Sequence, residues 1–387
     1  MKKILYYCPT FYPENSGYAN AFIGLLNSVK ENFKIEVITA KELGSEKEIE
    51  IKNVKINRFK NRFDFNQQVK SFYVQFKMAL FVNKNYANYD KIFIETFEDV
   101  YFLTLLSKKA CKKAIVRVHS TAETEYNFYF KKIFYRISKF LINNSIKKKI
   151  FNIASTNNYH VQFVKEIYYK KNLFEISKRN FFVIPNCLES NDDFYMKDFN
   201  KKKLFVTLGR LDFDGAMQKG QGDLLNAIIP LKRDFISTNS KLIIIGNGSY
   251  FNLIQKILNE NELSFVQLIE RLNHEETLTV LKSADFSILP ARFEGLSMFA
   301  LESIGCSNAV IFSETGGLID LYNNNGFLFP PQNIGELSNS IKKAIYLGAD
   351  ELEKMKRNSH SHFQNNFSPK IVASSFEKAI NNINILS

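Results

Sequence analysis

The sequence predicts an α/β protein built from two doubly wound units in tandem. Short apolar runs alternate with longer segments of helical periodicity along most of the chain, and this alternation is typical of parallel sheets covered by helices. The pattern restarts near residue 203. A length of 387 residues also favours two domains, each large enough to bury its own core.

Six short apolar runs predict the strands of the first unit. Each is rich in Ile, Val, Phe or Tyr, and helical patterns separate several of them. The runs are KILYY (3–7), FKIEVITA (33–40), KIFIE (91–95), AIVRVH (114–119), NIAS (152–155) and FFVIP (181–185). After the first run, apolar residues recur at Phe22, Leu25, Leu26 and Val29, which predicts a helix.

Five further runs predict the strands of the second unit. They are KLFVTLG (203–209), KLIIIG (241–246), SFVQLI (264–269), FSILP (286–290) and AVIF (309–312). The segment ESNDDFYMKDFNKKK (189–203) is polar, charged and without a clear period, so we place the linker there. The expected domains are residues 1–190 and 203–368, followed by a C-terminal helical segment at 369–387.

The charge and cysteine content leave several partners open. The chain carries 52 Lys and Arg against 39 Asp and Glu, a net charge of +13, which permits nucleic acid, an anionic membrane or a phosphorylated substrate as partner. An AT-rich coding sequence would raise the lysine content equally well. The four cysteines have no paired spacing, and no apolar run reaches the length of a signal-peptide core or a membrane span. We therefore expect a cytoplasmic protein.

Candidate site residues follow the predicted strands, where ligands of open α/β sheets bind. With two such sheets, the expected site is the cleft between the domains. Gly17, beside Ser16, lies in a small-residue turn before the first helix, which a phosphate or sugar could approach; an ordinary strand-to-helix turn explains it equally well. Arg210 and Lys219 follow the strand KLFVTLG and could clamp a diphosphate, although each alone is more often a solvated surface charge.

Within the same loop, the DFD at 212–214 looks like the metal-binding Asp-x-Asp of other sugar-transfer enzymes. We expect no metal there, because the two neighbouring cations already supply positive charge.

The stretch EGLSMFALE (294–302) places a glutamate at each end of a predicted helix start. Glu294 lies in the loop, the helix is expected to begin near Ser297 or Met298, and Glu302 lies about one turn inside it. The N–H groups of Ser297, Met298 and Phe299 would form an anion site. A diphosphate flanked by two sugars fits this pattern, with each carboxylate accepting hydroxyl hydrogen bonds. Glutamates near a helix N-terminus are also favoured by the dipole alone.

These residues carry a resemblance to a known family. EGLSMFALE resembles the Glu-x7-Glu motif of the retaining glycosyltransferases of family 4, which have the GT-B fold of two facing Rossmann-like domains with the active site in the interdomain cleft. The resemblance extends through LGRLD, KG (219–220), LIIIGNGS (242–249), LNHEETLTVLKSADFSILPARFEG (272–295), SETGG (313–317) and NNGFLFPP (324–331). The N-terminal half agrees more loosely, through PENSGYA, RVHST (117–121) and VIPNC (183–187).

The resemblance assigns roles to individual residues. It implies that the second domain binds a nucleotide-sugar donor, that the first binds the acceptor, and that the C-terminal helix crosses back to the first domain. The implied donor contacts are Glu294 to the sugar hydroxyls, Glu302 to the ribose, Arg210 and Lys219 to the diphosphate, Gly17 near the phosphates, and Arg271 and Leu272 near the base. His119 would lie beside the transferred sugar.

The resemblance also implies the reaction. A hexosyl group would move from a nucleotide sugar, most commonly a UDP- or GDP-sugar, to a glycan or lipid-linked glycan with retention of anomeric configuration and without metal or other cofactor. A role in bacterial surface polysaccharide synthesis, such as that of lipopolysaccharide, O-antigen or capsule, is expected because such roles are common in the family. The chain departs from the family pattern in having Ser16 and Gly17 in place of paired glycines, and Ser307-Asn308-Ala309 in place of Gly-x-Pro.

Three alternatives stay open at this point. The segment 128–149 has the pattern of a basic amphipathic helix, which fits either an anionic membrane at the inner face of the cytoplasmic membrane or a core-facing helix with a solvated basic face. A basic non-catalytic protein that binds membranes or nucleic acid would explain the charge but not the residues at the strand ends; we expect no nucleic-acid partner. A phosphorylase or epimerase would share the fold.

Overall fold

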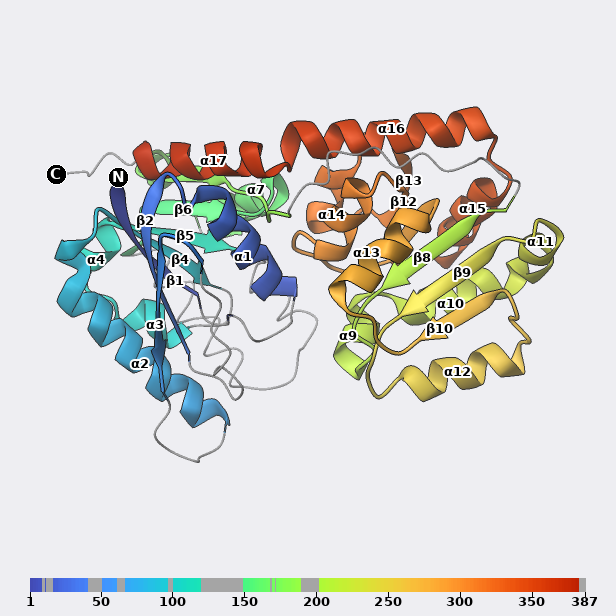
Figure 1. Ribbon diagram of the computed structural model, residues 1–387, viewed down its shortest axis with the longest axis horizontal. Helices are drawn as coiled ribbons and strands as arrows, with labels where there is room; N and C mark the ends of the chain where they lie inside the picture. The colour runs from blue at the N-terminus through green and yellow to red at the C-terminus, as the bar shows by residue number, and fades with distance from the viewer. Residues whose placement is uncertain are drawn as a thin grey trace. The chain divides into compact units, whose positions relative to one another are not determined.

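The structure, a computed structural model, describes most of the chain. The described residues are 1–8, 11, 17–40, 51–60, 67–96, 100–119, 149–167, 169–170, 172–188 and 202–382. The chain divides into two compact units, of which unit 1 comprises Met1–Glu189 with Pro369–Ser387 and unit 2 comprises Ser190–Ser368. Unit 1 is therefore formed from two separate stretches of chain, and its second stretch contains α17 (Pro369–Asn381) (Figure 1).

Unit 1 contains a parallel sheet. In the part of the chain that the structure describes, its seven strands lie in the order β3-β2-β1-β4-β5-β6-β7. They are β1 (Lys2–Tyr7), β2 (Phe33–Ala40), β3 (Val54–Phe59), β4 (Lys91–Thr96), β5 (Ala114–Val118), β6 (Asn152–Ser155) and β7 (Asn180–Val183). The strand order reverses between β1 and β4, as in doubly wound folds. Six of these strands were predicted.

Side chains of β1 alternate between the two faces of this sheet. Leu5 and Tyr7 pack into one core with α2 (Gln67–Asn85), whereas Ile4 and Tyr6 pack into a second core with α1 (Gly17–Val29) and α17. Figure 1 shows α2 and α17 on opposite sides of the sheet. The other described helices of unit 1 are η1 (Tyr86–Asn88), α3 (Val100–Leu105), α4 (Lys108–Lys112), α7 (Asn158–Ile167) and α8 (Leu173–Ser177).

Unit 2 contains a second parallel sheet, in the order β10-β9-β8-β11-β12-β13. The strands are β8 (Leu204–Leu208), β9 (Lys241–Ile245), β10 (Val266–Ile269), β11 (Phe286–Leu289), β12 (Ala309–Ser313) and β13 (Gly326–Phe329). The first five were predicted. In this sheet the order reverses between β8 and β11, so the loops after these two strands emerge at one edge beside a switch point.

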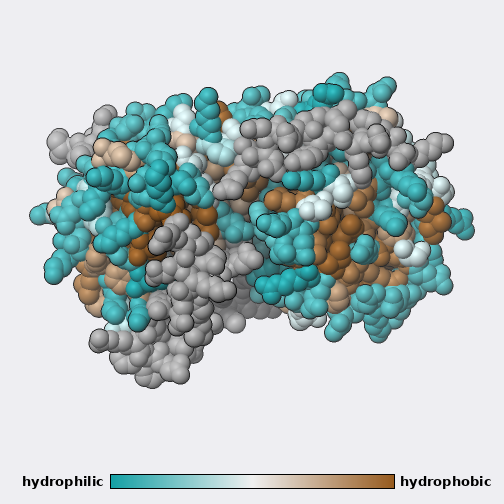
Figure 2. All heavy atoms as spheres, viewed as in Figure 1, coloured by the Kyte–Doolittle hydropathy of each residue, from teal (hydrophilic) through white to brown (hydrophobic). Residues whose placement is uncertain are grey.

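Helices cover both faces of the second sheet. They are α9 (Phe213–Gln218), α10 (Gln221–Ile228), η2 (Ile229–Leu231), α11 (Lys232–Ser237), α12 (Phe251–Glu260), α13 (His274–Ser283), α14 (Met298–Gly305), η3 (Gly316–Leu321), α15 (Ile334–Ile345) and α16 (Ala349–Asn366). Aromatic rings anchor the core: Phe205 of β8 stacks on Phe286 at 5.3 Å between centroids and meets Phe235 edge-on at 5.5 Å. The visible surface of the described residues is mainly hydrophilic, as amphipathic covering helices predict (Figure 2).

The predicted α/β class with two doubly wound units is confirmed. None of the helices in the described ranges combines the length and apolar character that crossing a membrane requires. Two predictions concern residues outside those ranges: the membrane-binding or core-facing helix at 128–149, of which only Lys149 is described, and most of the linker at 189–203.

Candidate functional site

The candidate site in unit 2 is formed by the loops that follow β8 and β11. These strands are neighbours, so their carboxyl ends lie at the same edge of the sheet. The loop after β8 carries Arg210 and, beyond α9, Lys219. The loop after β11 carries Glu294 and leads into α14. The sequence prediction that these residues follow strands of one sheet is therefore correct.

Lys219 and Glu294 form a direct ion pair between the Lys219 Nζ and a Glu294 carboxylate oxygen. Their side chains are 16% and 10% exposed, so the pair is largely screened from solvent. The aliphatic stem of Lys219 packs on Gly209, where a Cβ would lie 3.0 Å from the Lys219 Cγ. A charged pair held in a partly desolvated position interacts more strongly with a charged ligand than a solvated pair does.

Glycines set the shape of the loop that carries Glu294. Gly220 has a φ of 66°, and a Cβ there would lie 2.0 Å from the Pro290 carbonyl oxygen. Gly316 has a φ of 51°, and a Cβ there would lie 1.8 Å from the Glu294 carbonyl oxygen. Both positions require glycine because of the backbone conformation and the close approach. The loop is thereby held between two glycine-containing turns.

Hydrogen bonds and an ion pair complete this support. The Arg292 backbone N–H donates to the Gln218 carbonyl at 2.8 Å, and the Gly317 N–H donates to the Gly295 carbonyl at 2.8 Å. The Arg292 guanidinium donates to both carboxylate oxygens of Asp223, at 3.0 and 3.2 Å. Sequence reasoning did not single out Arg292 or Asp223, because a bidentate pair between residues so far apart has no local signal.

α14 begins where the sequence predicts. Ser297 is its N-cap, and the Ser297 hydroxyl accepts a hydrogen bond from the Ala300 N–H at 3.3 Å. Met298 and Phe299 occupy the first turn, where backbone N–H groups have no acceptor within the helix. This end of α14 is therefore suited to bind an anion.

Glu302 lies in the second turn of α14 and is buried. Its Oε1 lies 3.2 Å from Nε2 of His274, the first residue of α13. His274 was not predicted. The available signal was the sequence NHEE, in which Asn273 and Glu276 form a capping box with Asn273 as the N-cap, so that α13 begins at His274.

Arg210, Arg271 and Leu272 lie outside the network of contacts around Lys219 and Glu294. The Arg210 side chain is 64% exposed, and its Nη1 lies 3.7 Å from Oδ2 of Asp212. Asp212 caps α9 by accepting from the Gly215 N–H at 2.9 Å, so the DFD segment has a structural function. Arg271 and Leu272 follow β10, and β9 separates β10 from β8 in the sheet. Among the described residues, no group of three or more His, Cys, Asp or Glu could hold a metal ion.

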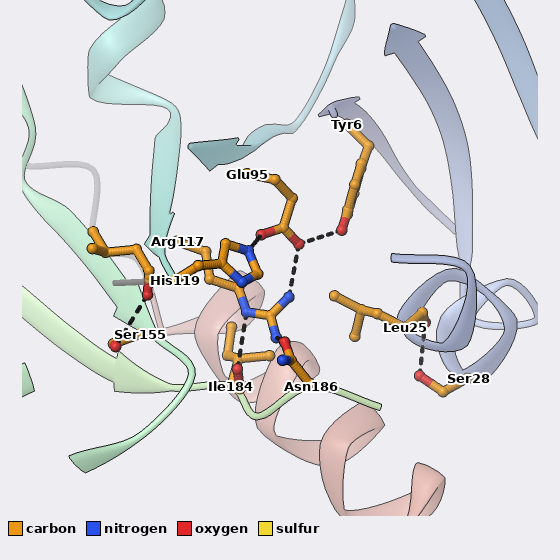
Figure 3. Close-up of polar contacts among 10 residues, drawn as sticks. Tyr6, Leu25, Ser28, Glu95, Arg117, His119, Ser155, Ile184 and Asn186 are labelled. Carbon is orange, nitrogen blue, oxygen red and sulfur yellow. Dashed lines mark hydrogen bonds and ion pairs between the residues drawn. The ribbon is translucent and has the colours of Figure 1, made fainter. Parts of the chain in front are cut away.

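Unit 1 carries the other two predicted residues. Gly17 is the exposed first residue of α1, and Ser16 lies outside the described ranges. His119 follows β5 and is 3% exposed. Its Nε2 lies 2.5 Å from Oε2 of Glu95, which comes from the neighbouring strand β4 (Figure 3). The sequence predicted His119 but not its partner.

Glu95 is the centre of a buried polar cluster. Its Oε1 accepts a hydrogen bond from Arg117 Nη1 at 2.8 Å and another from the Tyr6 hydroxyl (Figure 3). Arg117 also donates through Nε to the Ile184 carbonyl and through Nη2 to Oδ1 of Asn186, both at 2.9 Å.

Charge in this cluster is fixed by its surroundings. Burial raises the pKa of Glu95, but the Arg117 guanidinium and His119, with the hydrogen bonds to Glu95, lower it to about 2. Burial lowers the pKa of His119, although Glu95 opposes that change. Burial and the Glu95 carboxylate raise the pKa of Tyr6 well above its ordinary value. At neutral pH, Glu95 is therefore an anion beside a neutral imidazole and a protonated phenol.

Comparisons with known sequences find similarity that is concentrated in unit 2. Residues 191–362 match the family model described as glycosyl transferases group 1. An uncharacterized glycosyltransferase of Methanocaldococcus jannaschii is 32% identical over 235 residues, which cover 59% of this chain and 61% of that protein. Glycogen synthase of Mycobacterium tuberculosis is 27% identical over 141 residues, which cover 36% of this chain and 33% of that protein. The chain thus spans about three fifths of the first relative and a third of the second.

Solved structures share the fold along the whole chain. Sucrose-phosphate synthase from Thermosynechococcus elongatus superposes with a TM-score of 0.75 at 16% identity, covering 98% of each chain. HepE of Anabaena, in complex with UDP and glucose, superposes with a TM-score of 0.70 at 14% identity, covering 98% of this chain and 99% of that one. These similarities confirm the predicted GT-B fold class.

Proposed function

We propose that the protein is a retaining glycosyltransferase that moves a hexosyl group from a nucleotide-sugar donor to a glycan or lipid-linked glycan acceptor. The observation that carries the proposal is the Lys219–Glu294 pair beside the first turn of α14. It lies within the segment that matches glycosyl transferases group 1. The similarity to HepE, which was solved with UDP and glucose, supports a UDP-sugar as donor.

In this proposal unit 2 binds the donor. Lys219 supplies an ammonium group with three hydrogen-bond donors, so it can keep one contact with Glu294 while it binds a diphosphate oxygen. The N–H groups of the first turn of α14 add to that anion site. Glu294 accepts hydrogen bonds from the sugar hydroxyls, and Glu302 accepts them from the ribose.

Arg210 provides a second cation for the diphosphate. Its exposed side chain is free to turn toward a ligand because its contact with Asp212, at 3.7 Å, is long for a hydrogen bond. Arg271 and Leu272 would contact the base. The described residues of unit 1 contribute Gly17 near the phosphates and His119 beside the transferred sugar.

The proposed chemistry is stabilisation of the leaving diphosphate. As the bond between the anomeric carbon and the diphosphate breaks, negative charge grows on the diphosphate, and Lys219, Arg210 and the α14 N–H groups stabilise it. The departing diphosphate takes the proton of the acceptor hydroxyl on the same face of the sugar. Because these cations carry the charge, we propose that the reaction proceeds without metal or cofactor.

The acceptor is proposed to belong to bacterial surface polysaccharide synthesis at the cytoplasmic face of the membrane. If residues 128–149 bind an anionic surface, the protein will co-sediment with anionic vesicles more strongly than with neutral ones.

A thermal-shift screen tests the donor proposal. UDP, GDP, ADP, CMP and their common sugar conjugates are added, with EDTA, to the native protein and to Glu302→Gln. We expect one nucleotide class to raise the melting temperature of the native protein, because a ligand that binds only the folded state stabilises it. The shift should fall in Glu302→Gln, which loses the charged acceptor for the ribose. Absence of any shift in the native protein, or a shift that EDTA abolishes, would contradict this part of the proposal.

A further inference from the structure

Helix α2 of unit 1 carries an apolar stripe on its outer side. Phe72, Phe76 and Leu80 recur at every fourth position, so they follow one side of the helix. Their exposed fractions are 44%, 37% and 52%, and the rings of Phe72 and Phe76 stack with centroids 6.3 Å apart. The other side of α2, with Met78 and Val82, packs into the core. The core of unit 1 therefore gives no reason for the apolar character of the stripe.

Lysines gather near this stripe. Lys77 and Lys84 lie on α2, and Lys108, Lys109 and Lys112 lie on α4. The sequences of α2, α3 and α4 contain no Asp or Glu. All of these lysines except Lys77 are exposed, and none of the exposed ones forms an ion pair with a residue in the described ranges. Their positive charge is therefore not compensated by neighbouring carboxylates.

Hydrogen bonds between α2 and the start of α4 join the stripe to these lysines. The N–H of Ser107, the N-cap of α4, donates to Oδ1 of Asn83 at 2.7 Å, and Nδ2 of Asn83 donates to the Leu105 carbonyl at 2.9 Å. Asn83 lies about one turn beyond Leu80 on α2, so α4 lies beside the C-terminal half of α2 (Figure 1). We call the combined region the α2–α4 surface, which comprises Phe72, Phe76, Leu80, Lys84, Lys108, Lys109 and Lys112.

The chemistry of the α2–α4 surface favours an anionic lipid bilayer as its partner. Soluble proteins seldom expose neighbouring apolar side chains rimmed by charge unless a partner covers them. Apolar side chains of a helix can enter the boundary between headgroups and acyl chains, while lysines beside them attract anionic headgroups. A second copy of the chain would bring two sets of lysines together, so repulsion opposes self-association through this surface. Residues 128–149 are also basic, so like charge opposes their covering it.

We propose that the α2–α4 surface docks the protein on an anionic membrane. Phe76 and Leu80 enter the headgroup region, and Lys84 with the lysines of α4 contacts the lipid phosphates. This inference goes beyond the proposed function, because it assigns the membrane contact to described helices outside residues 128–149.

Helix α8 of unit 1 provides a matched comparison. Leu173 and Phe174 are 80% and 68% exposed, so they are at least as accessible as the stripe on α2. They are followed by Glu175, which forms ion pairs with Lys178 at 3.3 Å and Arg179 at 3.0 Å. The exposed apolar pair on α8 thus lies among compensated charges, and we expect it not to bind anionic lipid.

Tryptophan fluorescence tests the docking directly, because the chain contains no tryptophan. Full-length Phe76→Trp and its control Phe174→Trp are mixed with vesicles of phosphatidylcholine, with and without phosphatidylglycerol. We expect the emission of Phe76→Trp to move to shorter wavelength only with the phosphatidylglycerol vesicles, and brominated acyl chains to quench it. The emission of Phe174→Trp should not change. An unshifted emission of Phe76→Trp, or equal shifts in the two variants, overturns the proposal.

Co-sedimentation with the same vesicles tests the lysines. The test variant loses four charges, through Lys84→Gln, Lys108→Gln, Lys109→Gln and Lys112→Gln. The control variant loses four charges from helices of unit 2, through Lys232→Gln, Lys256→Gln, Lys342→Gln and Lys343→Gln. We expect vesicle affinity to fall by about fivefold for each lysine removed in the test variant. An equal fall in the control variant would show that net charge alone explains the binding, and would overturn the proposal.

Other occupants of the surface give different results. Native protein that binds neither kind of vesicle overturns the proposal, as does binding that only replacements within residues 128–149 abolish. A dimer in sedimentation equilibrium that Phe76→Ser with Leu80→Ser dissociates would assign the surface to a second copy, and would also overturn it. These measurements need no nucleotide, so a failure of the donor screen would contradict the proposed function and leave the docking proposal to be decided by the vesicles.

Discussion

Lys219 and Glu294 lie 75 positions apart in the sequence and touch in unit 2. The sequence predicted both residues as ligands of one substrate, because each follows a strand and matches a family motif. It did not predict that they pair with one another. The Glu95–Arg117 pair was missed altogether, because it depends on the register of β4 against β5, which no local pattern encodes.

The first prediction concerns turnover. In the proposed mechanism Lys219 stabilises the leaving diphosphate, so we expect Lys219→Met to lower kcat by a factor of about 10²–10³, equivalent to about 3–4 kcal/mol. The matched control is Lys232→Met, which breaks the Lys232–Glu262 pair at 2.7 Å elsewhere in unit 2. Steady-state kinetics with the identified donor measure both. Equal activity of the two variants would show that Lys219 has no role in the reaction.

The second prediction concerns acid stability. Burial lowers the pKa of His160 to about 4, from 6.5. Below pH 6.5 His160 is protonated in the unfolded chain but still neutral in the folded protein. The free energy of unfolding therefore falls as the pH drops toward 4. At 1.36 kcal/mol per pKa unit, the change in the pKa of His160 lowers the free energy of unfolding by about 3 kcal/mol.

Denaturant unfolding at several pH values measures how the free energy of unfolding changes with pH. This dependence should weaken in His160→Gln and persist in His362→Gln, a partly exposed position on α16. A native slope that survives in His160→Gln would assign the acid sensitivity to another group.

Among the elements, the buried strands were the easiest to predict and the edges of the sheets the hardest. Apolar runs such as FKIEVITA coincide with a strand, because both faces of that strand are covered. β3 was missed because half of the residues in VKINRF are polar and the strand is only partly buried at the sheet edge, so it lacks the continuous apolar run of the other strands. β13, at the edge of the other sheet, lies between Asn and Pro residues that indicate turns.

The third prediction belongs to the loop between α9 and α10. Gly220→Ala forces a Cβ against the Pro290 carbonyl in a left-handed backbone, so we expect a loss of more than about 1 kcal/mol in stability, with weaker nucleotide binding. Gly222→Ala is the control two residues later: a Cβ there meets nothing within 4 Å, and the change should be neutral or stabilising by up to about 1 kcal/mol. Thermal melts with and without nucleotide compare the two. Similar behaviour would mean that the Gly220 turn can relax without moving the Glu294 loop.

At the scale of the whole molecule, unit 1 depends on a helix, α17, that follows unit 2 in the sequence. Phe376 of α17 is fully buried and packs against Phe93 of β4 and Phe33 of β2, with ring centroids 4.8 and 5.6 Å apart. Helix α17 therefore forms part of the core rather than an appendage.

The fourth prediction follows from that packing. Phe376→Ala should destabilise unit 1 by about 3–5 kcal/mol, because it removes a large buried ring and leaves a cavity. Ile371→Ala, on the same helix but 36% exposed, should change stability by less than about 1 kcal/mol. Hydrogen exchange of the β1 and β4 amides reports the stability of unit 1 directly. Equal protection of these amides in both variants would show that α17 contributes little to the core.

The divided composition of unit 1 also has a consequence during synthesis. The ribosome releases residues 1–189 first, and α17 emerges only after all of unit 2. At 5–20 residues per second, the intervening stretch of roughly 180 residues takes about 10–40 s to make. Unit 2 is continuous and can fold as it emerges, while the apolar side chains of β1, β2 and β4 that α17 will cover are still uncovered. We therefore expect this apolar surface of unit 1 to stay uncovered, and prone to non-native association, until α17 has been made.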